Sequence, residues 1–132
     1  MCNSCDVQID GVWTHLRVGQ SYETPDDEKH VPFTISRMTA DAIEILPQGI
    51  IVKREAFSVA LRYLRTNRHD DNHPCKIGSS NEPKFASPLC REARSRNSGV
   101  RCINYILPIL AKLGIVGIGS MRPNTTWVIR CL

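Results

Sequence analysis

Residues 98–113 read SGVRCINYILPILAKL, and the rest of the chain is best interpreted outward from this stretch. Its apolar residues recur three and four positions apart, as on one face of a helix: Ile103, Ile106, Leu107, Leu110 and Leu113. Asn97, Ser98 and Gly99 lie at its start and are of the residue types that cap helix N-termini. Gly114 follows its end and can adopt the left-handed conformation that ends a helix. The stretch therefore predicts a helix with one core-facing side.

The opposite side of this helix carries charged, amide and ring side chains: Arg101, Asn104, Tyr105, Pro108 and Lys112. Water tolerates such a surface, and nucleic acid is bound by the same groups. Pro108 has no N–H to donate to the Asn104 carbonyl, so we expect a kink that costs about 3 kcal/mol if nothing compensates. Tyr105 lies one position from the apolar stripe, and a core position is an equal alternative for it.

Further elements are predicted on both sides of this helix. Residues 115–118 and 126–130 are rich in β-branched and aromatic residues and predict a hairpin, with residues 119–125 as its loop. Residues 87–94 predict a short helix in which Ser87 is the N-cap and Pro88 the first helical residue. Residues 54–66 predict an earlier helix, and Ile77 is a candidate for a short strand between the two.

Residues 54–130 resemble a winged helix-turn-helix domain in this layout: helix, short strand, two helices, then a two-stranded wing. The resemblance covers the layout and no invariant motif. It implies a helix placed in the groove of duplex DNA and a wing that reaches the neighbouring backbone, with sequence-specific regulation of transcription as the commonest use. Some domains of this layout bind protein instead of DNA.

Residues 1–52 predict a different kind of unit. Strand-like runs at 31–38, 42–46 and 50–52, separated by turn residues, indicate a small antiparallel β unit of three or four strands. Almost no linker separates Val52 from the helix that starts at residue 54, so the two parts should share a core. We therefore expect one compact α+β fold, with an acidic β unit at 1–52 and a basic winged helix-like unit at 53–132.

Charge is divided unevenly between these two parts. Residues 53–132 hold 14 of the 17 Lys and Arg, whereas residues 1–52 hold 8 of the 13 Asp and Glu. Such an arrangement orients a protein toward a polyanion. Together with the layout, this charge distribution favours a protein that binds duplex DNA. Such a protein could act as a homodimer.

The candidate nucleic-acid contacts follow from this interpretation. Side chains in the first turns of a groove helix are those that reach base edges. Arg101, Asn104 and Tyr105 are thus the candidate base contacts, and Lys112 and Arg122 are candidate phosphate contacts from the helix end and the wing tip. Three arginines before the helix could clamp the backbone: Arg91, Arg94 and Arg96.

Two functions other than DNA binding are also compatible with the sequence. The same fold could be a protein–protein interaction module with its helix and wing in an interface. Residues 69–73 hold two His and two Asp that could bind a divalent ion in an enzyme, although a solvated connector explains the same residues. Cys2 and Cys5 form a C-x-x-C pair, but a structural zinc site needs two further ligands, so no metal or other cofactor is expected.

The ends of the chain and its hydropathy bear on location. No run approaches the roughly 20 apolar residues of a membrane-spanning helix, and the N-terminus lacks the basic-then-apolar pattern of a secretion signal. A cytoplasmic protein is therefore expected. No glycine-rich phosphate loop or nucleophile motif supports an enzyme.

Overall fold

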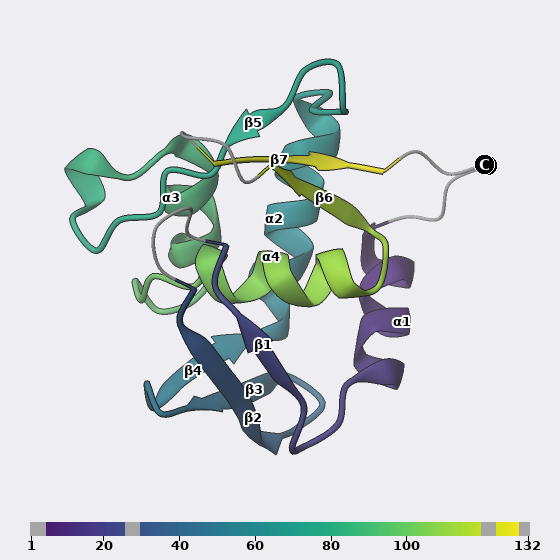
Figure 1. Ribbon diagram of the computed structural model, residues 1–132, viewed down its shortest axis with the longest axis vertical. Coiled ribbons are helices and arrows are strands. Elements are labelled where there is room, and N and C mark those ends of the chain that lie inside the picture. Colours follow the sequence, from purple (N-terminus) through teal and green to yellow (C-terminus); the bar gives the residue numbers. More distant parts are fainter. Residues whose placement is uncertain (1–4, 26–29, 120–123, 130–132) are drawn as a thin grey trace.

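The computed structural model describes residues 5–25, 30–119 and 124–129. Two antiparallel sheets lie at opposite ends of the molecule, and helices fill the space between them (Figure 1). The elements in chain order are α1 (Cys5–His15), β1 (Ser21–Glu23), β2 (Pro32–Met38), β3 (Ala42–Leu46), β4 (Ile50–Lys53), α2 (Arg54–Thr66), β5 (Cys75–Lys76), the 3-10 turn η1 (Pro83–Phe85), α3 (Pro88–Ser95), α4 (Ile103–Lys112), β6 (Val116–Gly119) and β7 (Thr125–Val128). The expected α+β class is confirmed.

The prediction that residues 1–52 form only a β unit is wrong for the first part of that segment, where α1 is helical. Ile9, Val12, Trp13 and Leu16 are all buried, and they fall at the spacing of one helix face. Burial of this face against α2 decides the conformation.

The four-stranded sheet follows the prediction for residues 31–52. Its strand order is β1-β2-β3-β4, with every neighbouring pair antiparallel. Alternate residues of β2 and β3 are buried, as expected for a sheet with one face in the core: Phe33, Ile35, Ile43 and Ile45. Arg54 begins α2 directly after Lys53 ends β4, so sheet and helix are joined without a linker.

Helices α2 and α3 and the second sheet of the basic half also lie where the sequence predicted them. The predicted start of α4 is wrong: the helix begins at Ile103 with Cys102 as its N-cap, and Ser98 and Gly99 have φ of +55° and +78°, which no helix start has. The Ser87 hydroxyl accepts a hydrogen bond from the Cys90 N–H at 3.1 Å, with Pro88 in the first helical turn, so this N-cap is confirmed. Gly114 has φ +74° directly after the end of α4, as a helix-ending residue requires. The strand order of the second sheet is β5-β7-β6.

Helix α4 is the central element of the protein. Six of its ten residues are buried: Ile103, Tyr105, Ile106, Leu107, Ile109 and Leu110. One continuous hydrophobic core holds side chains from α1, both sheets, α2, α3 and α4. The two parts of the chain therefore form one folded unit, as the missing linker suggested.

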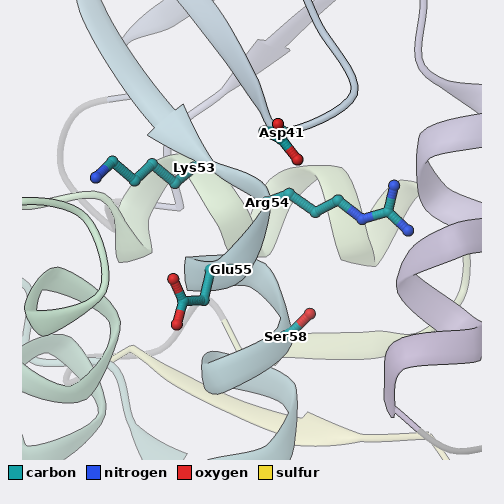
Figure 2. Close-up of a pocket in the computed structure, with 5 residues that line it drawn as sticks. All are labelled: Asp41, Lys53, Arg54, Glu55 and Ser58. Atoms are coloured by element: carbon teal, nitrogen blue, oxygen red, sulfur yellow. The ribbon is translucent and has the colours of Figure 1, made fainter.

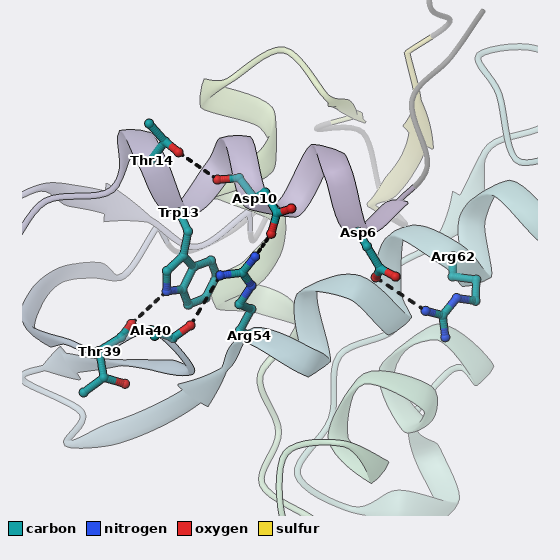
Figure 3. A network of polar contacts seen from close by, with 8 residues as sticks. All are labelled: Asp6, Asp10, Trp13, Thr14, Thr39, Ala40, Arg54 and Arg62. Carbon is teal, nitrogen blue, oxygen red and sulfur yellow. Dashed lines mark hydrogen bonds and ion pairs between the residues drawn. The ribbon is translucent and has the colours of Figure 1, made fainter.

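Helix α1 neutralises part of the positive charge of α2 (Figure 3). Asp10 forms an ion pair with Arg54, and Asp6 lies 3.8 Å from the Arg62 guanidinium. The Arg54 guanidinium also lies over the Trp13 ring, 5.4 Å from its centroid, while the Trp13 Nε1–H donates to the Thr39 carbonyl. Part of the basic charge of the second half is thus used within the molecule.

The amide of Asn97 joins the two halves. Its Oδ1 accepts from the Lys53 N–H at 2.7 Å, and its Nδ2 donates to the carbonyls of Ile51 and Val100 at 3.1 and 3.2 Å. Asn97 is 2% exposed. One side chain therefore caps the open edge of β4 and fixes the connection between α3 and α4.

No helix among the described residues is long and apolar enough to span a bilayer.

We expect Asn97→Ala to lower the free energy of unfolding by about 3 kcal/mol, because main-chain groups inside the protein lose their partners. Chemical denaturation followed by circular dichroism measures the change. Asn72→Ala is the matched control, since Asn72 is exposed and should change stability by less than about 0.5 kcal/mol. Equal effects of the two substitutions would show that Asn97 does not join the halves.

The hairpin provides a second prediction, because Gly117 and Trp127 face each other across β6 and β7. A Cβ added to Gly117 would lie 2.5 Å from Trp127 Nε1, whereas one added to Gly11 in α1 meets nothing within 4 Å. We expect Gly117→Ala to destabilise the protein by about 1–3 kcal/mol, and Gly11→Ala to stabilise it by about 0.5–1 kcal/mol. Thermal unfolding of the two variants checks the opposite signs.

Candidate nucleic-acid interface

Residues 78–87 form a closed loop between β5 and α3. The Ser87 N–H donates to the Gly78 carbonyl at 3.0 Å, and the Ser87 hydroxyl donates to the Ile77 carbonyl at 2.6 Å. The ends of the loop therefore meet, as in an Ω-loop. Gly78 has φ +50°, and a Cβ there would lie 2.6 Å from the Ser87 Cβ, so the closure requires glycine.

The guanidinium of Arg94 fastens this loop to the α3–α4 connection. It donates to the carbonyls of Ser80 at 3.0 Å, Asn81 at 3.3 Å and Gly99 at 3.0 Å. Arg94 was predicted as a contact to the DNA backbone, but these carbonyls occupy its donors. We therefore assign it the role of positioning the two loops next to each other.

The start of β7 reaches the same end of the molecule. The Ile77 N–H, beside the start of the closed loop, donates to the Asn124 carbonyl at 3.1 Å. Three connections thus meet here: the loop 78–87, the α3–α4 connection and the hairpin. Figure 1 shows this end at the left, where α4 begins next to α3. We call it the loop end.

Arg101 and Asn104 lie where α4 begins at the loop end. Both side chains are half-buried, so each retains some access to solvent. Asn104 Oδ1 is buried and receives no hydrogen bond from the part of the chain that the structure describes. A buried amide oxygen without a donor costs about 1–3 kcal/mol, and such atoms call for an explanation beyond packing.

Tyr105 lies in the core. It is 5% exposed, and its ring meets Phe33 of β2 edge to face with a centroid separation of 5.2 Å. Tyr22 of β1 also stacks on Phe33, with ring centroids 5.7 Å apart, and burial raises the pKa of Tyr22. We therefore remove Tyr105 from the candidate contacts, because its ring joins α4 to the four-stranded sheet.

The remaining predicted contacts do not gather at one place. Arg91 is exposed on α3, and Arg96 lies 3.5 Å from Glu55 of α2 in an exposed ion pair. Lys112 stands at the far end of α4, about 15 Å from its start. Arg122 lies outside the described residues. The predicted contacts that remain at the loop end are Arg101 and Asn104. Arg91 also remains, because it lies one turn before Arg94 on α3.

The closed loop adds two residues to the candidate contacts that were not predicted from the sequence. Phe85 is 70% exposed, and the Lys84 ammonium lies 5.1 Å from the centre of its ring. The turn residues around them favoured an ordinary loop, and the sequence does not show that Arg94 holds that loop in place. The signal available was an aromatic residue next to a lysine within a polar connection.

A hollow of about 370 Å³ lies at the start of α2, lined by Asp41, Lys53, Arg54, Glu55 and Ser58 (Figure 2). Lys53 and Arg54 extend in opposite directions, and two carboxylates balance their charge. Arg54 is already bound to Asp10 and to the Ala40 carbonyl (Figure 3). The hollow is therefore a poor site for an anion.

The candidate metal ligands are held in other contacts. His69 Nδ1 lies 2.9 Å from the His73 carbonyl oxygen, and the two rings are 4.8 Å apart. Within residues 5–25, 30–119 and 124–129, no group of three or more His, Cys, Asp or Glu is placed to hold a metal ion. Cys2 lies outside the described residues. Burial raises the pKa of the Cys75 thiol to about 11 and that of Cys102 to about 12, so both stay protonated near neutral pH.

Comparison of the chain with models of protein families, with curated proteins and with solved structures gives no match.

Replacing Arg94 tests whether it holds the loop end together. We expect Arg94→Ala to reduce stability by about 1.5–3 kcal/mol, because charged hydrogen bonds to several carbonyls are lost, and to speed proteolytic cleavage within residues 78–87. Denaturation curves and mass spectrometry of the fragments measure these effects. Arg91→Ala, an exposed change on the same helix, should alter neither; equal cleavage of both variants would contradict this role.

Proposed function

We propose that residues 54–129 form a winged helix-like unit that binds duplex DNA at the loop end. The observation that carries this proposal is the Arg94 guanidinium, which bonds to both the loop 78–87 and Gly99. It brings Lys84 of that loop to the end of the molecule where Arg101 precedes α4. The proposed contacts are Lys84, Arg91, Arg101 and Asn104.

The order and pairing of the elements support this proposal. After α2 come β5, α3, α4 and the β6–β7 hairpin, and β7 lies between β5 and β6. This order matches the layout predicted for a winged helix-turn-helix domain, in which the last helix and the two-stranded wing contact DNA. On that last helix, Asn104 Oδ1 has no hydrogen-bond donor among the described residues, a further sign that the position is not chosen for packing alone.

Burial of α4 limits the kind of recognition. Phe33 packs against Tyr105, and six α4 residues lie in the core, so the whole helix cannot enter a major groove. We therefore propose contacts from the start of α4 and from the surrounding loops, mainly to phosphates. Contacts of this kind fix position and affinity more than sequence.

A protein–protein interaction module is the second candidate. It is favoured by a groove beside α4 that β1 and the C-terminal half of the helix line with few charges. Under this alternative the protein would not bind DNA, and the exposed Phe85 would contact a protein partner.

Fluorescence anisotropy with a mixed-sequence duplex, repeated at several salt concentrations, tests DNA binding. We expect affinity to fall steeply with salt, and Lys84→Ala and Arg101→Ala each to lower the slope of log affinity against log salt by about one, because each removes a phosphate contact. Absence of binding at low salt would refute the proposal.

The control is Arg62→Ala. Arg62 is an exposed arginine that faces α1 and pairs with Asp6, away from the loop end (Figure 3). The Arg62→Ala substitution removes the same charge as Arg101→Ala but should leave the slope of log affinity against log salt unchanged. If the two variants weaken binding equally, the effect reflects net charge alone and the proposed contacts are incorrect.

A further inference from the structure

A groove of about 540 Å³ lies between β1 and the C-terminal half of α4. Ser21, Tyr22 and Glu23 line it from β1, and Pro108, Ala111 and Lys112 line it from α4. It lies at the opposite end of α4 from Arg101 and is separate from the proposed DNA contacts. A strand on one side and a helix on the other is the arrangement in which many domains bind an added β-strand.

The hydrogen bonds of β1 show which of its main-chain groups face β2. The Ile35 N–H donates to the Gln20 carbonyl at 2.9 Å, and the Thr24 N–H donates to the Val31 carbonyl at 3.0 Å. In an antiparallel ladder, every second residue bonds to the neighbouring strand. The main-chain N–H and C=O groups of residues 20, 22 and 24 therefore point toward β2.

Ser21 and Glu23 consequently direct their N–H and C=O groups away from β2. Because β1 is the terminal strand of its sheet, no further strand from the described part of the chain lies on that side. The residues that the structure describes offer these outward groups no hydrogen-bond partner. Opposite Glu23 in β2 is Pro32, whose missing N–H is consistent with a pair that exchanges no hydrogen bond.

The two edges of this sheet are therefore treated differently. At the β4 edge, the Asn97 amide bonds to the Ile51 carbonyl and the Lys53 N–H and so occupies two of the outward groups. At the β1 edge, the outward groups of Ser21 and Glu23 have no partner among the described residues and lie next to a groove. An unprotected edge is a template for pairing with another strand.

We propose that a second copy of this chain docks at this edge, so that its β1 pairs antiparallel with this β1 about a two-fold axis near Tyr22. In that arrangement Ser21 of each copy lies opposite Glu23 of the other. Each pair exchanges both of its N–H···O bonds, and the two four-stranded sheets become one continuous sheet.

Charge complementarity favours a second copy as the occupant. Glu23 and Lys112 are exposed, carry opposite charges and line the same groove, and no ion pair among the described residues joins them. In the proposed pairing the Glu23 of each copy lies opposite the partner's Ser21, which lines the same groove as the partner's Lys112, so each Glu23 is brought beside a groove that holds a lysine. The antiparallel edge is likewise complementary to itself, which a foreign strand need not be.

Sedimentation velocity across the micromolar range, without DNA, tests this dimer. We expect a concentration-dependent dimer, roughly tenfold weaker in Glu23→Lys and in Lys112→Glu because like charges then face each other. The double variant Glu23→Lys/Lys112→Glu restores the attraction and should recover most of the affinity. Ser21→Pro, which removes one outward N–H, should also weaken the dimer.

The control is Glu92→Lys, the same charge reversal on an exposed residue of α3 outside the groove, which should leave the dimer unchanged. Thermal unfolding verifies that each variant is folded. A monomer at every concentration would overturn the proposal, as would a dimer that neither single charge reversal weakens. Either result leaves the DNA-binding proposal standing, because no DNA is present.

Discussion

The hydrogen bonds of the Asn97 side chain join the four-stranded sheet to the helices of the second half of the chain. One buried amide bonds to Ile51 and Lys53 of the β4 edge and to Val100 in the connection before α4. It holds the four-stranded sheet, the start of α2 and the start of α4 in one arrangement. An amide suits this place because it offers both an acceptor and two donors, as a neighbouring strand would. An edge that would otherwise be open is thereby closed from within the chain.

Because α4 is fixed between two sheets, its surface is divided between different tasks. Its middle belongs to the core, where Tyr105 and Phe33 join the helix to the four-stranded sheet. Its start opens on the loop end with Arg101 and Asn104, and its end lines the groove beside β1 with Lys112. The two proposals therefore use opposite ends of a single rigid helix. Binding of DNA at one end and pairing of copies at the other are compatible in space.

The distribution of positive charge has a structural as well as a functional explanation. Arg54 and Arg62 pair with aspartates of α1, Arg96 pairs with Glu55, and Arg94 binds carbonyl groups. An excess of basic residues in the second half is therefore partly a means of attaching α1 and two loops. The cations that remain at the loop end are fewer than the composition suggests.

The sequence by itself determined the elements of the second half and three of the four strands of the first sheet. Local rules are strong there: residues 54–66 have one apolar stripe, Ser87 and Pro88 start a helix, and Gly114 ends one. Only the tertiary structure decided that residues 5–15 are helical, that Tyr105 is buried and that Arg94 is occupied by carbonyls. Each of these depends on neighbours that are distant in the chain, such as Phe57 beside Trp13 or Ser80 beside Arg94. Periodicity specifies which side of a helix is apolar, but long-range packing specifies what covers the polar side.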